Sequence, residues 1–320
     1  MKKNMDPMKM KTKLFILGIL SLFISSCNNS NTKELDGPAS GEITIAVDQS
    51  FAPIVNAEIK AFENIYQYTK INMVEFPENE AVAELLNDRV RGIVISRDLD
   101  EKEMENFNID GIKYRSFKFA MDGIALITGK ANTDTLINLD QLSGILKGEI
   151  TNWKELGAKK TSGKIVLVVD KGNSSNLRFL LDKFGLSNQD KLNIYEAGSN
   201  EEVINYVKDI PQAIGLIGSN WISDGDNPQS LQFIRSVNVL SVAEDASKPK
   251  NEYYQPFGYN LALKLYPLRR ELKIIIKEGH MGLGTGFVNY STGDMGQLIV
   301  LKFGLIPLTR PINIRQYTIN

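Results

Sequence analysis

Short apolar runs alternate with helical patterns along most of this chain, and that alternation is what most limits its fold. Residues 43–47 (ITIAV) are typical of a buried strand, and Pro53–Tyr66 then carries apolar residues at helical spacing. The alternation continues with strands expected at 71–76, 92–95, 165–169 and 213–218, and helices at 81–88, 176–184 and 200–207. Strands separated by helices form sheets whose faces the helices cover. The sequence therefore predicts an α/β fold.

The N-terminus has the pattern of a targeting segment rather than of a folded element. Five lysines precede the apolar stretch 14–24, which is too short to span a bilayer. The stretch ends in FISSC, which resembles the lipobox of bacterial lipoproteins, although a generic signal peptide is the alternative. We predict a signal peptide at 1–26, lipidation at Cys27 and a polar tether at 27–40.

Composition excludes several classes of function. The chain has 37 basic and 38 acidic residues, and residues 1–26 hold five Lys and one Asp, so 32 and 37 remain. A mildly acidic domain lacks the basic footprint of a nucleic-acid-binding protein. Cys27 is the only cysteine, so lipidation would leave no thiol for a disulfide or a metal site.

The remaining length is enough for two lobes. We assign residues 41–121 and 256–320 to lobe 1 and residues 122–255 to lobe 2. The chain would cross between the lobes at 121–123, between two extended segments at 112–119 and 123–128, and would return at 255–264. A helix or strand–helix pair is expected at 266–278, and a single last helix at 283–304.

The segment Leu142–Trp153 (LSGILKGEITNW) resembles a motif of phosphate-type (PstS-like) periplasmic substrate-binding proteins of ABC importers. Other segments resemble this family in the same order, so the resemblance covers nearly all of Gly41–Arg310: AIGLI at 213–217, YPL at 266–268 and GLIPL at 304–308. It implies a two-lobe type II periplasmic-binding-protein fold with a hinge and a central ligand cleft. It also implies a bound phosphate or similar small oxyanion, an ABC permease as partner and no cofactor.

The turn after the first strand is one candidate part of the ligand site. Free backbone N–H groups at a helix start favour an anion, and Ser50 adds a hydroxyl donor. The family resemblance implies that Ser50 and Phe51 contact the ligand. Asp48 or Ser50 acting as an ordinary helix N-cap is the alternative.

Two later turns carry similar groups. Ser96 offers a hydroxyl and Arg97 a bidentate guanidinium, unless Arg97 pairs with a nearby acid such as Asp98 or Asp100. The third turn, 170–178, is similar to the family's anion loop and places Ser174, Ser175, Asn176 and Arg178 at a helix start. Ser175 and Asn176 stand where the family usually has glycine and threonine, and Ser and Asn are also good N-caps.

The chain departs further from the family at Pro77–Glu80, where a Gly- and Ser-rich anion loop is usual. Glu78 and Glu80 would repel a phosphate dianion, so either they point away or the ligand is not simple phosphate. An acceptor for a protonated oxyanion is expected among three acids, between which the sequence does not choose: Asp48, Asp98 and Asp122.

Catalysis is not expected. The single histidine, His280, follows the end of an expected helix, where a surface or helix-end role is common. No spacing in the chain indicates a Ser-Lys dyad or a metal site.

Together, these features predict a monomeric, lipid-anchored receptor on the periplasmic side of the cell envelope, in the inner or the outer membrane. The alternative is a sensory or protein-interaction lipoprotein that keeps the same fold without transport.

Overall fold

The computed structural model describes residues 36–108, 114–187 and 190–311. These belong to one compact unit, Asp36–Asn320. The predicted signal peptide, Cys27 and most of the tether lie outside the described residues. Within the described part of the chain, no helix is both long and apolar enough to cross a membrane.

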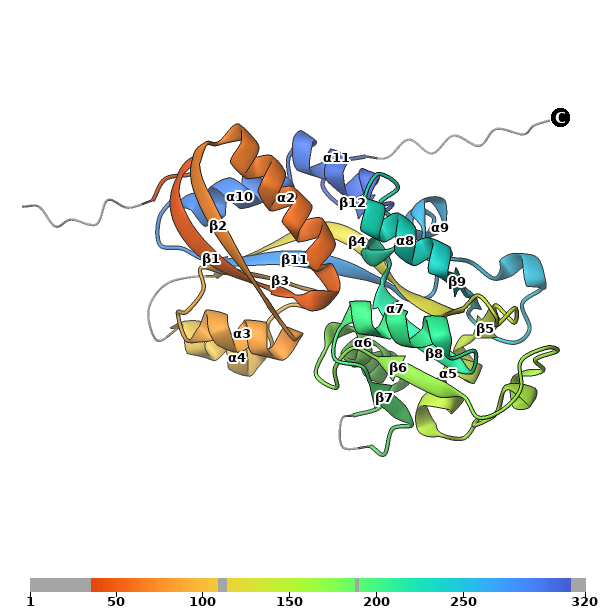
Figure 1. Cartoon of the computed structure of the whole chain (residues 1–320). Coiled ribbons are helices and arrows are strands. Elements are labelled where there is room, and N and C mark those ends of the chain that lie inside the picture. Colours follow the sequence, from red (N-terminus) through yellow and green to blue (C-terminus); the bar gives the residue numbers. More distant parts are fainter. Residues whose placement is uncertain (1–35, 109–113, 188–189, 312–320) are drawn as a thin grey trace, which may run out of the picture. The chain divides into compact units, whose positions relative to one another are not determined.

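One ten-stranded sheet runs through this unit, in the order β2-β1-β3-β11-β4-β8-β6-β7, with β9 and β12 also paired to β4 (Figure 1). The strand β4 (Tyr114–Gly129) is shared by two parts of the sheet. Its first half pairs with β11 (Arg269–Lys277), and its second half pairs with β8 (Ala213–Gly218). We call the two parts lobe 1 and lobe 2.

Lobe 1 contains the parallel strands β1, β2 and β3 beside the antiparallel β11. Its other elements are helices that cover this part of the sheet and a short strand near the C-terminus. The bounds are β1 Ser40–Asp48, η1 Gln49–Phe51, α2 Ala52–Ile65, β2 Tyr68–Phe76, α3 Glu78–Leu86, β3 Gly92–Ile95, α4 Glu101–Asn108, α10 Leu283–Ser291, α11 Asp294–Lys302 and β12 Ile306–Pro307.

Lobe 2 contains β6 between β8 and β7, all parallel, with β9 beside β4 and a separate two-stranded sheet of β5 and β10. The bounds are β5 Leu136–Asn138, α5 Leu139–Lys147, η2 Trp153–Leu156, β6 Val166–Val169, α6 Ser175–Phe184, β7 Ile194–Glu196, α7 Asn200–Asp209, η3 Ser219–Trp221, α8 Pro228–Ser236, β9 Val237–Val239, β10 Ser241–Ala243, η4 Lys250–Glu252 and α9 Gly258–Ala262.

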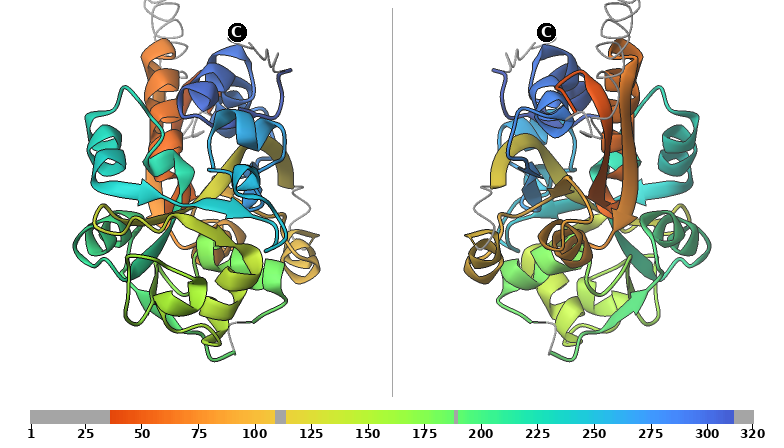
Figure 2. Two further views of the ribbon diagram at one scale, coloured as in Figure 1. Left: turned by 90° about the vertical axis from the view of Figure 1, so that its right-hand side faces the viewer. Right: turned by 90° about the vertical axis from the view of Figure 1, so that its left-hand side faces the viewer.

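Each lobe has a hydrophobic core on both faces of its part of the sheet. In lobe 1, α2 packs beside α10 and α11, as Figure 2 shows, and Phe62 contacts the rings of Phe287 and Tyr290. In lobe 2, α5 and α6 cover one face and α7 and α8 the other. Burying apolar side chains on both faces explains why the strands are continuous apolar runs.

Most local predictions are confirmed. Strands form at β1, β2, β3, β6 and β8, and helices at α2, α3, α6 and α7, each within a few residues of the expected bounds. The two extended segments around Met121–Gly123 are one continuous strand, β4. Leu261 and Tyr266 pack into the core of lobe 2 although they follow residue 256, and the chain pairs with lobe 1 again at β11.

Two predictions in the C-terminal part are wrong. The strand of the expected strand–helix pair at 266–278 forms as β11, but no helix forms there, because Arg270, Leu272 and Ile274 alternate with more exposed neighbours at the period of a strand. His280 therefore follows a strand rather than a helix. The expected single helix at 283–304 is two helices, α10 and α11, because the chain leaves helical geometry at Gly293, which has extended backbone.

Candidate functional site

The ends of strands from both lobes meet at the N-terminus of α6. Asp48 ends β1 and caps η1, since its carboxylate accepts from the Ser50 amide at 2.8 Å. The same carboxylate reaches lobe 2, where it accepts from the Ser175 hydroxyl at 3.0 Å and the Ser175 amide at 3.3 Å. The amide group at the start of α6 is thus already bound by a carboxylate of the chain itself. Asp48 is both a local cap and a bridge between the lobes.

Arg270 of β11 supplies a buried cation to this junction. Its side chain is 1% exposed and forms an ion pair with Asp122 at 3.1 Å. A second guanidinium nitrogen donates to the Ser175 hydroxyl at 3.0 Å, and the guanidinium carbon lies 4.5 Å from the centre of the Phe51 ring. The cation–π contact and the ion pair hold the guanidinium in one position.

A second buried carboxylate, Asp170, lies at the end of β6. It accepts from the Ser174 hydroxyl at 2.5 Å and from the side-chain amides of Asn176 and Asn200, both at 3.1 Å. Burial raises the pKa of Asp170. Ser174 also caps α6, accepting from the Leu177 amide at 3.4 Å, so the N-cap role that the sequence left open is real.

The acids also affect one another. Burial raises the pKa of Asp48 to about 6, with the negative charges of Glu78 and Asp170 as further causes. Hydrogen bonding by Ser50 and the positive charge of Arg270 act in the opposite direction. A carboxyl with this pKa can accept or hold a proton near neutral pH.

Glu78, the first residue of α3, points inward. It is buried and accepts from the Ser96 amide and the Ser96 hydroxyl, each at 2.9 Å. Arg178 of α6 forms an ion pair with the same carboxylate. Glu80 is exposed and accepts from the Asn173 side chain at 3.0 Å. The acidic departure from the family pattern therefore puts one carboxylate inside the junction and one at its surface.

The main chain of lobe 1 approaches lobe 2 closely at Ser50. The Ser50 carbonyl accepts from the Asn220 side chain at 2.7 Å and from the Trp221 indole at 3.1 Å. Gly218 lies beside it, and a Cβ at Gly218 would be 2.6 Å from this carbonyl oxygen. Only glycine permits this approach without a shift of one lobe.

Not all predicted residues reach the junction. The structure brings together seven of them: Asp48, Ser50, Phe51, Asp122, Ser174, Ser175 and Asn176. Ser96 and Arg178 meet at Glu78, whereas both terminal nitrogens of Arg97 bind Glu103, at 2.7 and 2.8 Å. Asp98 lies apart, with its side chain 61% exposed and paired with Lys273.

Sequence reasoning missed several junction residues: Asp170, Asn200, Ser219, Asn220 and Arg270. Asp170 directly follows β6, and Asp48 is the last residue of β1, so the position at the end of a strand could have indicated Asp170 from the sequence. Arg270 could be found only by recognising β11 as a strand, because its inward direction depends on the alternation of that strand.

The space at the junction is small. A cavity of about 20 Å³ lies between the lobes, with Asp48, Gln49, Glu75, Phe76, Pro77, Asp170, Lys171 and Ser174 around it. The side-chain oxygens of Asn176 and Asn220 are buried without a hydrogen-bond partner among the described residues. These unsatisfied acceptors mark the junction as a place where a donor, such as a protonated oxyanion or water, can be accommodated.

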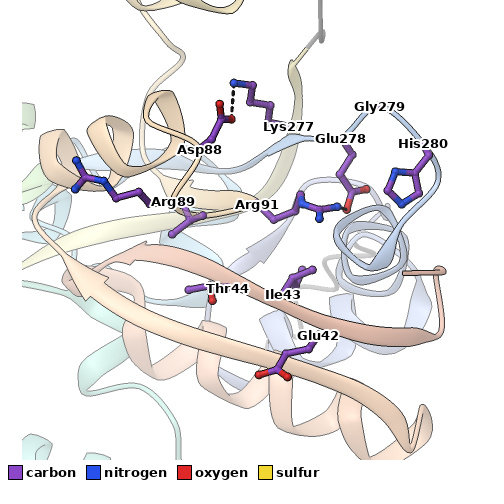
Figure 3. A pocket seen from close by; sticks show the side chains of 11 residues that line it. Glu42, Ile43, Thr44, Asp88, Arg89, Arg91, Lys277, Glu278, Gly279 and His280 are labelled. Carbon is purple, nitrogen blue, oxygen red and sulfur yellow. Dashed lines mark hydrogen bonds and ion pairs between the residues drawn. The ribbon is translucent and has the colours of Figure 1, made fainter. Parts of the chain in front are cut away.

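A larger hollow of about 550 Å³ lies elsewhere on lobe 1, between the start of β1 and the end of β11 (Figure 3). Figure 3 shows Arg91 reaching toward Glu278 and Lys277 paired with Asp88. His280 lies at its rim, 3.1 Å from the Asp36 carbonyl. Arg91 and Lys277 are bound to acids that line the same hollow, and Arg89 is bound to Glu84, so the hollow is a weaker candidate than the junction. In the described ranges, no group of three or more His, Cys, Asp or Glu side chains is placed to hold a metal ion.

Comparisons with known proteins agree with this arrangement. The sequence profile of the PBP superfamily domain matches residues 32–295, so the chain belongs to the PBP superfamily of periplasmic binding proteins. It is 24% identical over 306 residues to the phosphate-binding protein PstS of Borreliella burgdorferi, covering 93% of this chain and 99% of that protein. Against the phosphate-binding protein PstS of Bacillus subtilis it is 24% identical over 311 residues, covering 93% and 95%.

Solved structures show the same fold. A putative phosphate ABC transporter substrate-binding protein from Clostridium perfringens, solved with bound phosphate, superimposes with a TM-score of 0.69 at 24% identity. The match covers 84% of this chain and all of that one. An ABC-type phosphate transport receptor from Vibrio cholerae gives a TM-score of 0.60 at 22% identity, covering 83% and 100%. The fold is thus the two-lobe type II periplasmic-binding-protein fold that the sequence predicted.

Proposed function

We propose that this chain is the substrate-binding component of an ABC importer and that it binds phosphate or a similar small oxyanion between its lobes. The observation that carries the proposal is that Arg270 of lobe 1 meets the start of α6 of lobe 2, where it donates to the hydroxyl of Ser175, the first residue of that helix. Cationic and hydroxyl donors at a helix start suit an oxyanion. Membership of the PBP superfamily and the phosphate-binding relatives support this ligand class.

The candidate ligand residues are those predicted from the sequence, without Arg97, whose guanidinium is bound by Glu103, and with Arg270 added: Ser50, Phe51, Ser96, Ser174, Ser175, Asn176, Arg178 and Arg270. We assign Asp48 as the acceptor for a protonated oxyanion. Asp48 lines the cavity between the lobes, whereas Asp122 does not line it and is paired with Arg270, and Asp98 is exposed away from the junction. The two lobes would hold the ligand between them, with a hinge that opens to admit it and closes again in the loaded form that the permease recognises.

The chain's place in the cell is part of the same proposal. Lipidation of Cys27, followed by the polar tether, would hold a monomeric receptor at the membrane of the cell envelope, on the periplasmic side. Mass spectrometry of the purified mature protein tests this. An N-terminal peptide that starts at an unmodified residue other than Cys27 would contradict it.

Calorimetry tests the ligand. Protein stripped of bound ligand by partial unfolding is titrated with phosphate, with sulfate as the comparison anion. Ser174→Ala removes both a cap and a junction hydroxyl, whereas Asn227→Ala removes only the cap of α8. Asn227→Ala should lose about 1 kcal/mol of stability. Ser174→Ala should lose more, because it also removes the hydrogen bond to the buried Asp170 carboxylate. Only Ser174→Ala should weaken phosphate binding, by roughly three- to tenfold for one lost hydrogen bond.

The two possible failures have different meanings. If Ser174→Ala and Asn227→Ala weaken phosphate binding equally, the ligand does not bind at the start of α6. If phosphate produces neither heat nor a thermal shift with the wild-type protein, the protein does not bind phosphate. That result would favour the sensory or protein-interaction lipoprotein as the alternative function.

A further inference from the structure

The Glu78 carboxylate occupies a set of donors that has the composition of an oxyanion site. An acid in the first turn of a helix usually points to solvent, where the helix dipole stabilises it. Glu78 is instead 0% exposed. Its oxygens accept one backbone amide and one hydroxyl from Ser96, and two guanidinium nitrogens from Arg178. An amide, a hydroxyl and a guanidinium are the donors that carboxylate and phosphate oxygens share.

The neighbouring cations leave little positive charge for an incoming anion. Arg97 lies 3.6 Å from Glu78 but binds Glu103 through both terminal nitrogens. Arg178 also binds Asp182 at 2.6 Å. An anion that approaches Ser96 and Arg178 therefore meets donors that are already bound to acids of the chain.

The same carboxylate joins the lobes. Glu78 and Ser96 belong to lobe 1, on α3 and directly after β3, whereas Arg178 belongs to α6 of lobe 2. Arg178 also donates to the Ser96 hydroxyl at 2.9 Å. Glu78 thus already makes the contacts between the lobes that a bound anion would make.

We propose that the Glu78 carboxylate takes the place of the anionic ligand inside the protein and thereby lowers the affinity of the site for free anions. This inference rests on the proposed function. In the ligand-free protein its carboxylate fills the donors of Ser96 and Arg178 and holds the lobes together. A ligand must displace it to bind. A tethered carboxylate acts at an effective concentration in the millimolar range. A free monoanionic carboxylate therefore competes poorly, whereas a phosphate dianion has the extra charge and the extra oxygen to replace Glu78.

Binding measurements on the full chain test the displacement. Glu78→Gln keeps the volume and removes the charge, and Glu78→Ala also frees the donors. Glu80→Gln is the matched control, because it removes an exposed acid from the same helical turn. Phosphate should bind at least tenfold more tightly to both Glu78 variants, since the fraction of binding-competent protein rises. It should bind Glu80→Gln within about twofold of the wild-type affinity. Acetate should gain measurable binding only in Glu78→Ala.

Two results would overturn the inference in different ways. If the wild-type protein binds phosphate and the Glu78 variants bind it equally or more weakly, Glu78 supports the structure and does not compete. If neither the wild-type protein nor any variant binds phosphate, the inference and the proposed function fail together.

Small-angle scattering of the wild-type protein gives a test that does not depend on how the variants fold. Because Glu78 already joins the lobes, the radius of gyration of the ligand-free protein should stay the same when phosphate is added. A contraction on adding phosphate would show that the ligand-free lobes are apart and would refute the role of Glu78.

Discussion

Replacing Glu58 by glutamine should remove a loss of stability that the wild-type protein undergoes between acidic and neutral pH. Glu58 lies on α2, is 0% exposed, and neither of its carboxyl oxygens has a hydrogen-bond partner among the described residues. The neighbouring Ser291 hydroxyl is likewise without a partner. Burial raises the pKa of Glu58 from 4.5 to about 9. The folded protein therefore keeps a proton at neutral pH that the unfolded chain releases.

The size of the effect follows from this difference in proton binding. Below pH 4.5 both states are protonated, so Glu58 has no effect on the pH dependence of stability. As the pH rises, the unfolded state binds fewer protons and the free energy of unfolding falls, until the folded-state pKa is reached. At about 1.4 kcal/mol for each pH unit, the loss between pH 4.5 and pH 7 is about 3 kcal/mol.

Urea denaturation of the wild-type protein and Glu58→Gln at pH 4.5 and pH 7 measures this loss. The buried glutamine amide has its own cost, but that cost is the same at both pH values and cancels when the differences are compared. Glu58→Gln should gain about 3 kcal/mol relative to the wild-type protein between the two pH values. Glu149→Gln, at an exposed position, should gain almost nothing. An equal stability difference at both pH values would mean that folded Glu58 is ionised, which would refute the burial argument.

Two further substitutions test the junction. Arg270→Met leaves Asp122 buried without its ion-pair partner and should cost about 3–5 kcal/mol in thermal or urea unfolding. Adding Asp122→Asn should recover part of that cost, and no recovery would show that the pair is not the cause. Gly218→Ala puts a methyl group against the Ser50 carbonyl and should cost about 1–3 kcal/mol while increasing the radius of gyration in scattering. Gly225→Ala, where nothing lies within 4 Å, should change neither quantity.

The sequence was most informative about local structure. The apolar run at 43–47 and the helical spacing after Pro53 predict β1 and α2 because side-chain periodicity follows from the geometry of each element. The position of Ser50 and Ser174 at helix starts was predicted for the same reason. Their joint location was not derivable from local patterns, since the family resemblance alone indicated that these turns face one ligand.

The tertiary structure decided which charged groups enter the junction. Glu78 and Glu80 are two residues apart in one helical turn, yet one is buried against Arg178 and the other is exposed. Arg270 enters the junction because β11 pairs antiparallel with β3 and β4, which are distant in the sequence. A side chain's direction depends on the register of its strand and on the partners that bury it. The sequence by itself therefore determined most of the elements and the class of fold, whereas only the packing of the two lobes determined which charged side chains lie in the site.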